Sequence, residues 1–256
     1  MAAAVSRAYR DRGIVLRTHR LGETDRIVTF LLEGRGKVRA VAKGVRRPGS
    51  RIGARLEPFS HVDLELHEGR SLDIVRQVES IDTNEALRRD DRLHAAASVM
   101  VELVDTVATE GQRDPALLLQ LRAGLAALVA DPESAAVFVD AFLLRAASVV
   151  GFPVLTGACA RCRTPGPHPW LSVVGGGTLC DDCAGEGTRR VEADVVEAVR
   201  LLGDDGSWQA LPELARERPD ARATAGSYAR AFVEHHLDRR LRSYDAVDRG
   251  SGLARG

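Results

Sequence analysis

Residues 1–80 show the period-two pattern of β-strands. Residues 62–66, Val-Asp-Leu-Glu-Leu, alternate strictly between apolar and polar positions, which predicts a strand with one buried face and one face in water. β-Branched residues are also concentrated around residues 13–18 and 26–32, and glycine-bearing turns separate the runs. We therefore predict five strands, at residues 13–18, 26–32, 37–43, 62–66 and 72–78.

The number and spacing of these strands favour one architecture. Five strands between residues 13 and 78, with the longest connection between the third and the fourth, fit the partly open five-stranded barrel of the OB-fold. That barrel commonly binds oligonucleotides. A small barrel with another function would give the same strand count, so the pattern alone leaves both interpretations open.

From residue 82 onward, alanine and leucine recur at helical spacing. Two Asp-Pro pairs, Asp114-Pro115 and Asp131-Pro132, each place an acidic N-cap before a proline at the first helical position. The pattern predicts a barrel domain at residues 1–80 and an α-helical domain at residues 81–256, in which the last dozen residues, after Tyr244, are frayed. The predicted helices span residues 93–109, 115–129, 133–150, 192–202 and 224–244.

One segment concentrates positive charge. The whole chain has a formal net charge of zero, yet residues 1–56 hold 14 Lys/Arg and 4 Asp/Glu (14 − 4 = +10), so the remainder is at 22 − 32 = −10. Residues 34–55 contain eight Lys/Arg and no acidic residue. A strand at 37–43 would point three cations outward, and residues 44–53 are expected to form a flexible basic loop. This electropositive segment indicates nucleic-acid binding, with these candidate contacts: Arg35, Lys37, Arg39, Lys43, Arg46, Arg47 and Arg51.

Four cysteines form two C-x2-C pairs. Cys159 and Cys162 precede Cys180 and Cys183, and the segment 163–179 lies between the pairs. This spacing is typical of a tetrathiolate zinc ribbon, here an insertion at residues 156–186. Four sulfur ligands leave no position for water, so we expect one structural Zn²⁺ rather than a catalytic one. Free or redox-active thiols are the alternative, and His168 could replace one cysteine.

The sequence lacks the common motifs of enzymes. No G-x-x-x-x-G-K-[ST], H-E-x-x-H or G-x-S-x-G segment occurs, and the triplet at 175–177 lies inside the cysteine loop rather than between a strand and a helix. No apolar run is long enough for a membrane-spanning helix, and the start of the chain lacks a signal-peptide core. We therefore expect a cytoplasmic protein without enzymatic activity.

Several segments together resemble a known family. Gly-Ile-Val-Leu-Arg at 13–17, Gly-Glu-Thr-Asp-Arg-Ile-Val-Thr at 22–29 and the basic segment 36–48 are similar to the N-terminal signature of the RecO family of bacterial recombinational-repair proteins. Leu-Glu-Pro-Phe at 56–59 and Gly-Phe-Pro at 151–153 also look like that family. The resemblance covers residues 10–244, and the basic strand and loop are its most specific part.

The resemblance implies an N-terminal OB-fold, an α-helical C-terminal domain and a zinc ribbon that only some members possess. It implies a nucleoid-associated protein that binds single- and double-stranded DNA and anneals complementary strands without ATP. RecR and the single-stranded-DNA-binding protein would be its partners in loading RecA. Two alternatives from other classes are an RNA-binding OB/zinc-ribbon protein of the translation apparatus and a thiol redox enzyme.

Aromatic residues are scarce, at 4% of the chain. Within the segment 1–60, Phe30 and Phe59 are expected in the core, which leaves Tyr9 as the one other aromatic residue there. Because tight binders of single strands stack bases on aromatic rings, we expect affinity here to come from phosphate contacts instead, with the base edges free to pair. Five or six such contacts predict a slope near about −4 for log affinity against log salt.

Overall fold

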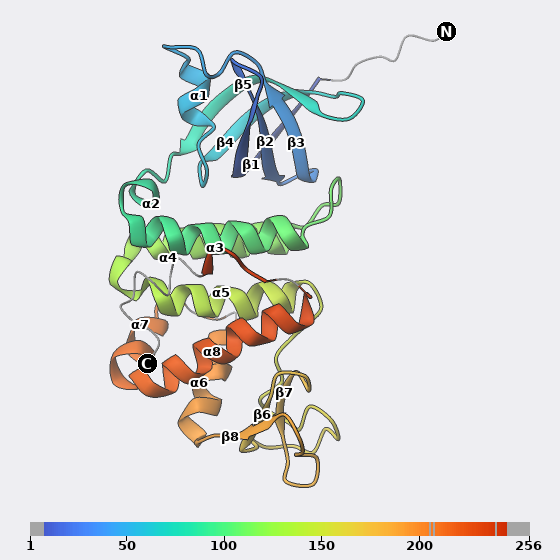
Figure 1. The fold of residues 1–256 in the computed structure, drawn as a ribbon, viewed down its shortest axis with the longest axis vertical. Helices are drawn as coiled ribbons and strands as arrows, with labels where there is room; N and C mark the ends of the chain where they lie inside the picture. The colour runs from blue at the N-terminus through green and yellow to red at the C-terminus, as the bar shows by residue number, and fades with distance from the viewer. Residues whose placement is uncertain (1–7, 205, 207, 239, 245–256) are drawn as a thin grey trace.

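The structure is a computed structural model that describes residues 8–204, 206, 208–238 and 240–244, with Arg51 described by its backbone alone. It has three parts along its longest axis: a β-barrel, a layered set of helices and a small three-stranded sheet (Figure 1). The barrel and the small sheet lie at opposite ends, with the helices between them.

The barrel contains the five predicted strands in the order β1-β2-β3-β5-β4 and is closed. The first half of β1 pairs with β4 and its second half with β2, and β3 pairs in parallel with β5. This OB-like barrel confirms the predicted fold. The strands are β1 (Ala8–Leu21), β2 (Asp25–Leu32), β3 (Gly36–Ala42), β4 (His61–His67) and β5 (Asp73–Asp82).

Two strands and one connection differ from the prediction. β1 and β5 extend beyond their apolar runs because their polar ends also pair with neighbouring strands. Between β3 and β4, where a loop was expected, the short helix α1 (Arg51–Arg55) forms. Ser50 caps it by accepting a hydrogen bond from the Gly53 N–H through its side-chain oxygen (3.2 Å).

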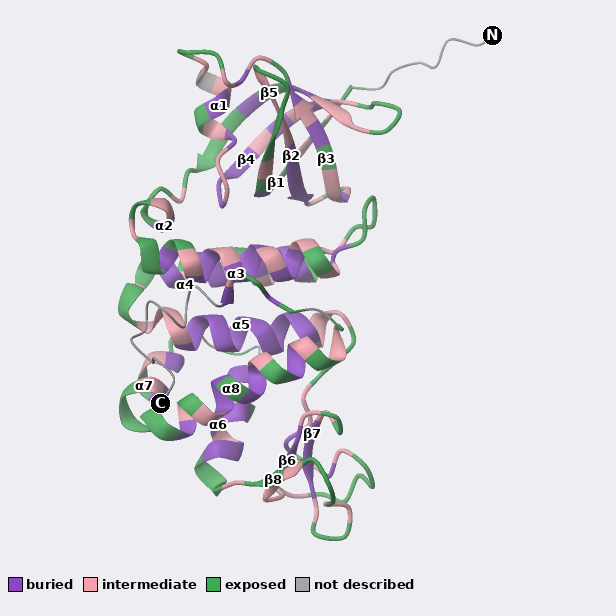
Figure 2. Ribbon diagram, viewed as in Figure 1, coloured by how far each residue is buried: buried purple, intermediate pink, exposed green. Residues whose placement is uncertain are grey.

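Alternation along the strands separates two apolar cores. The barrel interior is filled by residues such as Val28, Phe30, Ala40 and Leu64, all buried. A second and larger core lies among the helices, and Figure 2 shows the buried positions along α3 and α5. On β3 the buried Ala40 and Ala42 alternate with the less buried Arg39 and Val41, as the period-two pattern predicts.

The helical part is α2 (Ala86–Arg89), α3 (Asp91–Val107), α4 (Pro115–Ala130), η1 (Pro132–Ser134), α5 (Ala135–Val149), α6 (Ala193–Gly203), α7 (Leu211–Glu217) and α8 (Pro219–His236). Asp114 caps α4 as predicted, accepting a hydrogen bond from the Leu117 N–H (2.9 Å). Asp131 instead accepts a hydrogen bond from the Ser134 hydroxyl, and a 3₁₀ turn precedes α5.

The C-terminal helices were predicted less well. The predicted helix 224–244 is wrong at both ends, because α8 begins at a proline, Pro219, and ends at His236. The seven-residue α7 is too short to give a periodic signal. The predicted fraying of residues 245–256 falls outside the described residues. Among the described helices, none has both the length and the apolar composition needed to cross a bilayer.

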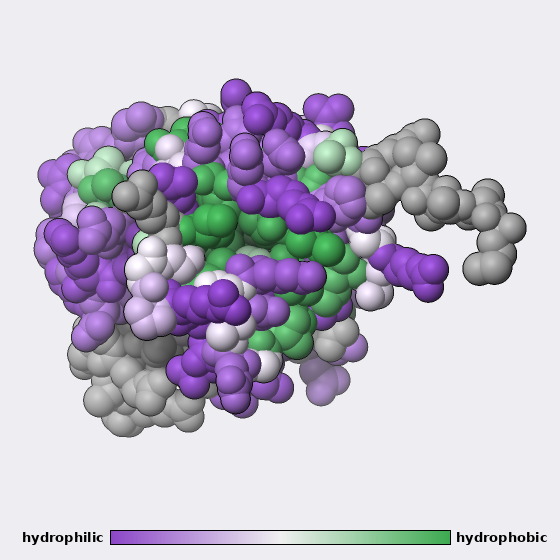
Figure 3. All heavy atoms as spheres, turned by 90° about the horizontal axis from the view of Figure 1, so that it is seen from above, coloured by the Kyte–Doolittle hydropathy of each residue, from purple (hydrophilic) through white to green (hydrophobic). Residues whose placement is uncertain are grey.

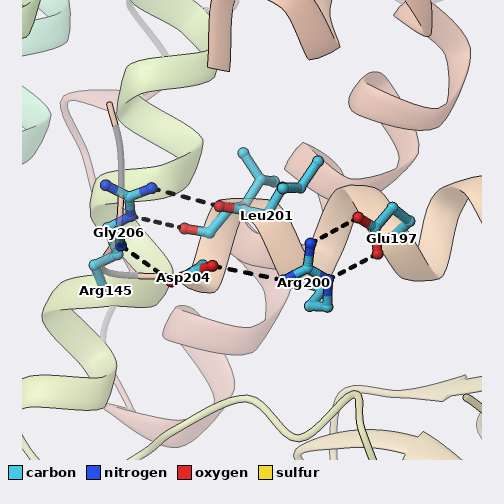
Figure 4. Close-up of polar contacts among 7 residues, drawn as sticks. Arg145, Glu197, Arg200, Leu201, Asp204 and Gly206 are labelled. Carbon is cyan, nitrogen blue, oxygen red and sulfur yellow. Dashed lines mark hydrogen bonds and ion pairs between the residues drawn. The ribbon is translucent and has the colours of Figure 1, made fainter. Parts of the chain in front are cut away.

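The small sheet is inserted between α5 and α6, with β6 (Trp170–Ser172) between β7 (Gly177–Leu179) and β8 (Thr188–Arg190). The two flanking helices also contact each other directly. The buried side chain of Arg145 on α5 donates hydrogen bonds to the last carbonyls of α6, from Nε to Leu202 O (3.1 Å) and from Nη2 to Leu201 O (3.4 Å) (Figure 4). These bonds satisfy carbonyls that the helix end leaves unpaired.

The barrel packs on the helices through the outer face of its first two strands. Ile14, Leu16 and Leu31 are buried in the helical core rather than in the barrel core. At the edge of this contact, Gly36 has φ +67, and a Cβ atom there would lie 1.7 Å from the carbonyl oxygen of Gln112. Glycine at this position therefore permits the close approach of barrel and helices.

We predict that Gly36→Ala lowers the free energy of unfolding by about 3 kcal/mol or more, because left-handed backbone strain and an overlap with main chain add together. Gly22→Ala is the matched control, since Gly22 has φ +57 but no atom within 4 Å of its added Cβ. It should cost only about 1–2 kcal/mol. Urea denaturation measures the free energy of unfolding of each variant. Equal losses of stability in the two variants would contradict the close contact at Gly36.

Candidate nucleic-acid interface and metal centre

The cations at the start of β3 are paired with carboxylates of the helical part. The Lys37 ammonium donates to the main-chain oxygen of Asp105 on α3 (2.6 Å) and lies 3.5 Å from its carboxylate. Arg17 pairs with the same carboxylate at 2.8 Å. The Lys37 and Asp105 side chains are only 15% and 12% exposed. Lys37 therefore contributes to the barrel–helix contact rather than to an open surface.

Two other candidate cations also have acidic partners. Arg35 pairs with Glu68 at 2.9 Å, and its guanidinium lies 3.8 Å from the ring centre of Tyr9. Arg39 lies 3.8 Å from Glu110, and both side chains are about half exposed. An exposed pair at this distance is weak, so Arg39 can exchange its partner at little cost.

The remaining described cations lie together in a connection that we call the cationic loop, residues 43–50. Lys43 and Arg47 are exposed, and neither has an ion pair among the contacts of the described residues. The Arg46 guanidinium donates to the main-chain oxygens of Gly22 (3.2 Å) and Glu23 (2.8 Å). Carbonyl partners fix its position but leave its charge unneutralised. Arg51 starts α1, and its side chain lies outside the described part.

The loop was predicted to be flexible, whereas the structure shows it hydrogen-bonded to the β1–β2 turn. The Asp25 carboxylate accepts hydrogen bonds from the Gly44 N–H (2.8 Å) and from the Thr24 hydroxyl (2.9 Å). The Arg46 N–H donates to Thr24 O at 2.9 Å, and Val45 inserts into the barrel core. The sequence pattern did not assign Asp25 a role, and the structure shows that it organises the loop.

Electrostatics around Asp25 agree with this arrangement. The hydrogen bond from the Gly44 N–H, with a second from Thr24, lowers the pKa of the Asp25 carboxyl below its usual 3.8, and the nearby charges of Lys43 and Arg47 add to the effect. Because the pKa of Asp25 is lower in the folded chain than in the unfolded chain, its carboxylate stabilises the folded loop at pH values above the unfolded-state pKa. This stabilisation is lost as the pH falls through the folded-state pKa. At neutral pH the loop is therefore held by a fully charged anchor.

The structure thus divides the predicted contacts into two groups. Lys43, Arg46 and Arg47 come together at the barrel end formed by the β1–β2 turn and the cationic loop. Arg35, Lys37 and Arg39 are engaged by Glu68, Asp105 and Glu110. Lys37 therefore does not point outward as the strand pattern predicted, and the DNA contacts of the seven residues stay a prediction. The sequence carries no local signal for the Lys37–Asp105 pair, because 68 residues separate its members.

The four cysteines come together at the opposite end of the molecule. Their Sγ atoms all lie within 4.8 Å of one another, and the Sγ atoms of Cys162 and Cys180 are 3.7 Å apart. A tetrahedral zinc with Zn–S bonds near ~2.3 Å requires sulfurs about 3.8 Å apart, so the cluster could hold such an ion. His168 is not part of the cluster, since its Nε2 bonds to Thr164 O at 2.9 Å.

Within the cluster, the pKa values of Cys159 and Cys162 are lowered, whereas burial raises that of Cys180 and a hydrogen bond with Cys180 raises that of Cys183. Burial alone would raise the pKa of Cys159, but hydrogen bonds from the N–H groups of Cys162, Cys180 and Arg161 outweigh it and lower that pKa to about 5. A thiolate at neutral pH is the ligand form that a metal needs. The small sheet also contacts α8. The Tyr228 hydroxyl donates to Ser172 O at 3.2 Å, and His236 Nε2 lies 2.8 Å from Val173 O.

The fold and these two sites define a class: an OB-barrel protein with a cationic loop at one end and a four-cysteine cluster at the other. Comparison with known families is consistent with this class. Residues 6–84 match the family model described as Recombination protein O N terminal, and residues 88–245 match Recombination protein O C terminal. The DNA repair protein RecO of Frankia casuarinae is 46% identical over 247 residues, which cover 94% of this chain and 98% of that protein.

The chain belongs to the RecO family of DNA repair proteins. The two family models together span almost all of the described residues, so the barrel and the helical part are both included. The expected family is thereby confirmed, and the role of the protein lies in DNA repair and recombination.

Proposed function

We propose that this chain is a recombination mediator that binds DNA through the cationic loop and anneals complementary single strands without ATP. The observation that carries the proposal is the group of Lys43, Arg46 and Arg47 on a hydrogen-bonded loop, with no carboxylate partner among the described ion pairs. Cations held in place neutralise phosphates, and they also offset the repulsion between two approaching backbones.

The scarcity of aromatic rings on the barrel supports annealing rather than tight storage of single strands. Phe30 and Phe59 are buried as expected, and the Tyr9 hydroxyl is hydrogen-bonded to Asp73 while Arg35 covers its ring. Without an aromatic stacking platform, binding rests mainly on phosphates, and the base edges stay available to an incoming strand. No step in this scheme requires catalysis by the protein.

Family membership extends the proposal to partners. As a RecO-like mediator, the protein would act with RecR and on DNA coated by the single-stranded-DNA-binding protein, and so help to load RecA. Duplex DNA is also a ligand in this proposal, because phosphate contacts do not depend on base sequence.

The structure changes the expected salt dependence. With the strand cations engaged, about three or four phosphates are neutralised, so log affinity for single strands should fall with log salt at a slope between about −2 and −3. Replacing Lys43 and Arg47 by Gln should lower affinity about tenfold and flatten the slope by about 1.4. Fluorescence anisotropy with a labelled oligonucleotide measures both quantities.

Arg10→Gln/Arg12→Gln is the matched control, because it removes the same charge from exposed arginines that pair with Glu65 and Asp63 on β4. It should leave the slope unchanged. Salt-independent binding, or equal losses in both double variants, would refute the cationic loop as the DNA site. Tighter binding of RNA than of DNA, with no annealing of complementary oligonucleotides, would favour an RNA-binding function instead.

We also propose that the four cysteines hold one structural Zn²⁺. Four thiolates complete the coordination shell, so the ion would stabilise the ribbon and its contacts with α8 without supplying a reactive site.

Cys159→Ala/Cys183→Ala should abolish bound zinc and lower the melting temperature by about 5 °C or more, because the ribbon loses its crosslink. DNA affinity should hold, since ribbon and barrel lie at opposite ends (Figure 1). His168→Ala, which removes a neighbouring side chain outside the cluster, should keep one zinc per chain. Metal analysis measures the zinc bound per chain, and calorimetry measures the melting temperature. An unchanged melting temperature together with loss of DNA binding would contradict the scaffolding role.

A further inference from the structure

Apolar side chains remain accessible at more than one place on the molecule. At the barrel end, hydrophobic residues lie in a hollow between hydrophilic ones (Figure 3). Another place is a cavity of about 480 Å³ between the barrel and α4, which we call the junction cavity. One of its walls is made by Ile14, His61, Asp82 and Asn84, and the other by α4. The junction cavity combines apolar surface with polar groups, and this combination is typical of a site for a small ligand.

The junction cavity is lined by a buried histidine with an unsatisfied nitrogen. His61 is only 8% exposed, and its Nε2 forms no hydrogen bond with any described residue. Burial, together with the positive charge of Arg122, lowers the pKa of His61 below its usual 6.5, so the ring is neutral at pH 7. A buried polar atom without a partner carries a free-energy cost, which a ligand with a matching donor or acceptor would remove.

Asn84 provides a second recognition group on the same wall. Its Nδ2 donates to Phe59 O at 2.9 Å, and its main-chain N–H donates to the Asp82 carboxylate at 2.9 Å. These bonds fix the residue at φ +47, a left-handed conformation that asparagine tolerates better than most residues. Among the contacts of the described residues, its Oδ1 and its second amide proton are unused. A free amide edge of this kind can bind the N6 and N7 atoms of adenine with two hydrogen bonds.

The α4 wall offers a flat apolar surface. Ala123 and Ala126 line it and lie on the same face of the helix, since they are three positions apart. Their small side chains leave a planar ring room to lie against the helix. Leu119 and Val129 border this surface and are 65% and 40% exposed.

The same wall carries a cation that can change partners. The Arg122 guanidinium lies 3.6 Å from the Glu33 carboxylate, and the two side chains are 46% and 43% exposed. An exposed pair at this distance contributes little stability, so a competing anion can replace Glu33. A guanidinium presents paired N–H donors that match the oxygens of a phosphate. Arg122 is therefore suited to bind a phosphate at the edge of the junction cavity.

We propose that the junction cavity binds a free mononucleotide, with the base on Ala123 and Ala126, its edge toward Asn84 and His61, and its phosphate on Arg122. Adenine is the preferred base because of the Asn84 amide. An aromatic carboxylate would use the alanines and Arg122 but would leave the Asn84 amide and the His61 nitrogen unpaired. Inorganic phosphate would use Arg122 alone.

This site is separate from the proposed DNA contacts, since no residue of the cationic loop lines the junction cavity. The nucleotide would touch both the barrel and α4. Its binding would therefore also stabilise the contact between the two parts of the chain.

Isothermal titration calorimetry on the full chain tests the proposal with adenosine monophosphate, adenosine and ribose 5-phosphate. Adenosine monophosphate should bind at one site and about tenfold more tightly than either fragment, because each fragment lacks one set of contacts. Arg122→Gln should weaken its binding about tenfold. Arg200→Gln on α6 is the matched control, since Arg200 is also 46% exposed and paired with carboxylates, and it should leave the affinity unchanged.

Two further variants locate the site without changing charge. Ala126→Leu fills the cavity from an exposed position on α4, where leucine is a good helix former, and should abolish binding. Ala116→Leu, exposed on the same helix but outside the cavity, should bind normally. The imidazole NMR signals of His61, identified by their absence from His61→Gln, should shift when adenosine monophosphate is added.

Absence of binding even in a large excess of adenosine monophosphate would overturn the inference. Equal affinity for ribose 5-phosphate would contradict the base contacts, and full binding by Ala126→Leu would contradict the location. Displacement of the nucleotide by a low concentration of a single-stranded oligonucleotide would overturn its assignment as a free mononucleotide. Lys43→Gln/Arg47→Gln should bind adenosine monophosphate normally, so this inference and the proposed function can fail independently.

Discussion

The packing of the helical part against the outer face of β1 and β2 is the contact on which the surface chemistry depends. By burying Ile14, Leu16 and Leu31, it fixes which part of the barrel face is closed. The Arg17–Asp105–Lys37 group lies at the border of this contact, where partial burial makes an ion pair costly to break. Beyond that border lies the cationic loop, with Lys43 and Arg47 exposed.

The same constraint explains why counting charges along the sequence overstates the size of the proposed DNA site. The basic segment is continuous in sequence, but Lys37 is neutralised by Asp105 of the helical part and Arg35 by Glu68 of the barrel. Arg39 is only weakly paired, and the cationic loop has no carboxylate partner among the described ion pairs. The segregation of charge along the chain therefore has two uses. Part of it holds the barrel on the helices, and part of it provides a cationic surface whose geometry Asp25 sets.

The fold was largely predictable, because the signals that specify it are local. Alternation identified the strands, Asp114-Pro115 marked the start of α4, and the cysteine spacing identified the ribbon. The misses have physical reasons. Helix α7 is too short for periodicity, and the end of α8 has neither a glycine nor a proline to mark it. Asp105 and Asp25 accept hydrogen bonds from residues that are 68 and 19 positions away in the sequence. These contacts can therefore be recognised only in the folded structure.

The ribbon and the barrel contribute to the protein in different ways. The small sheet contacts α8 through Tyr228, while Arg145 independently joins the helices on either side of the insertion. The four cysteines would crosslink the insertion through the proposed Zn²⁺. Among the residues that the structure describes, no hydrogen bond or ion pair joins the small sheet to the cationic loop, which lies at the other end of the long axis (Figure 1). Stability at one end and DNA binding at the other can therefore vary separately.

The central claim is that the cationic loop, and not the start of β3, contacts phosphates. The chain has only two lysines, and one belongs to each group: Lys37 is paired and mostly buried, and Lys43 is exposed. Lysine acetylation followed by mass spectrometry, with and without a single-stranded oligonucleotide, therefore measures the reactivity of one lysine from each group in the same experiment. We expect rapid modification of Lys43 that DNA suppresses and slow modification of Lys37 that DNA does not change. Protection of Lys37 with unchanged reactivity of Lys43 would contradict the account.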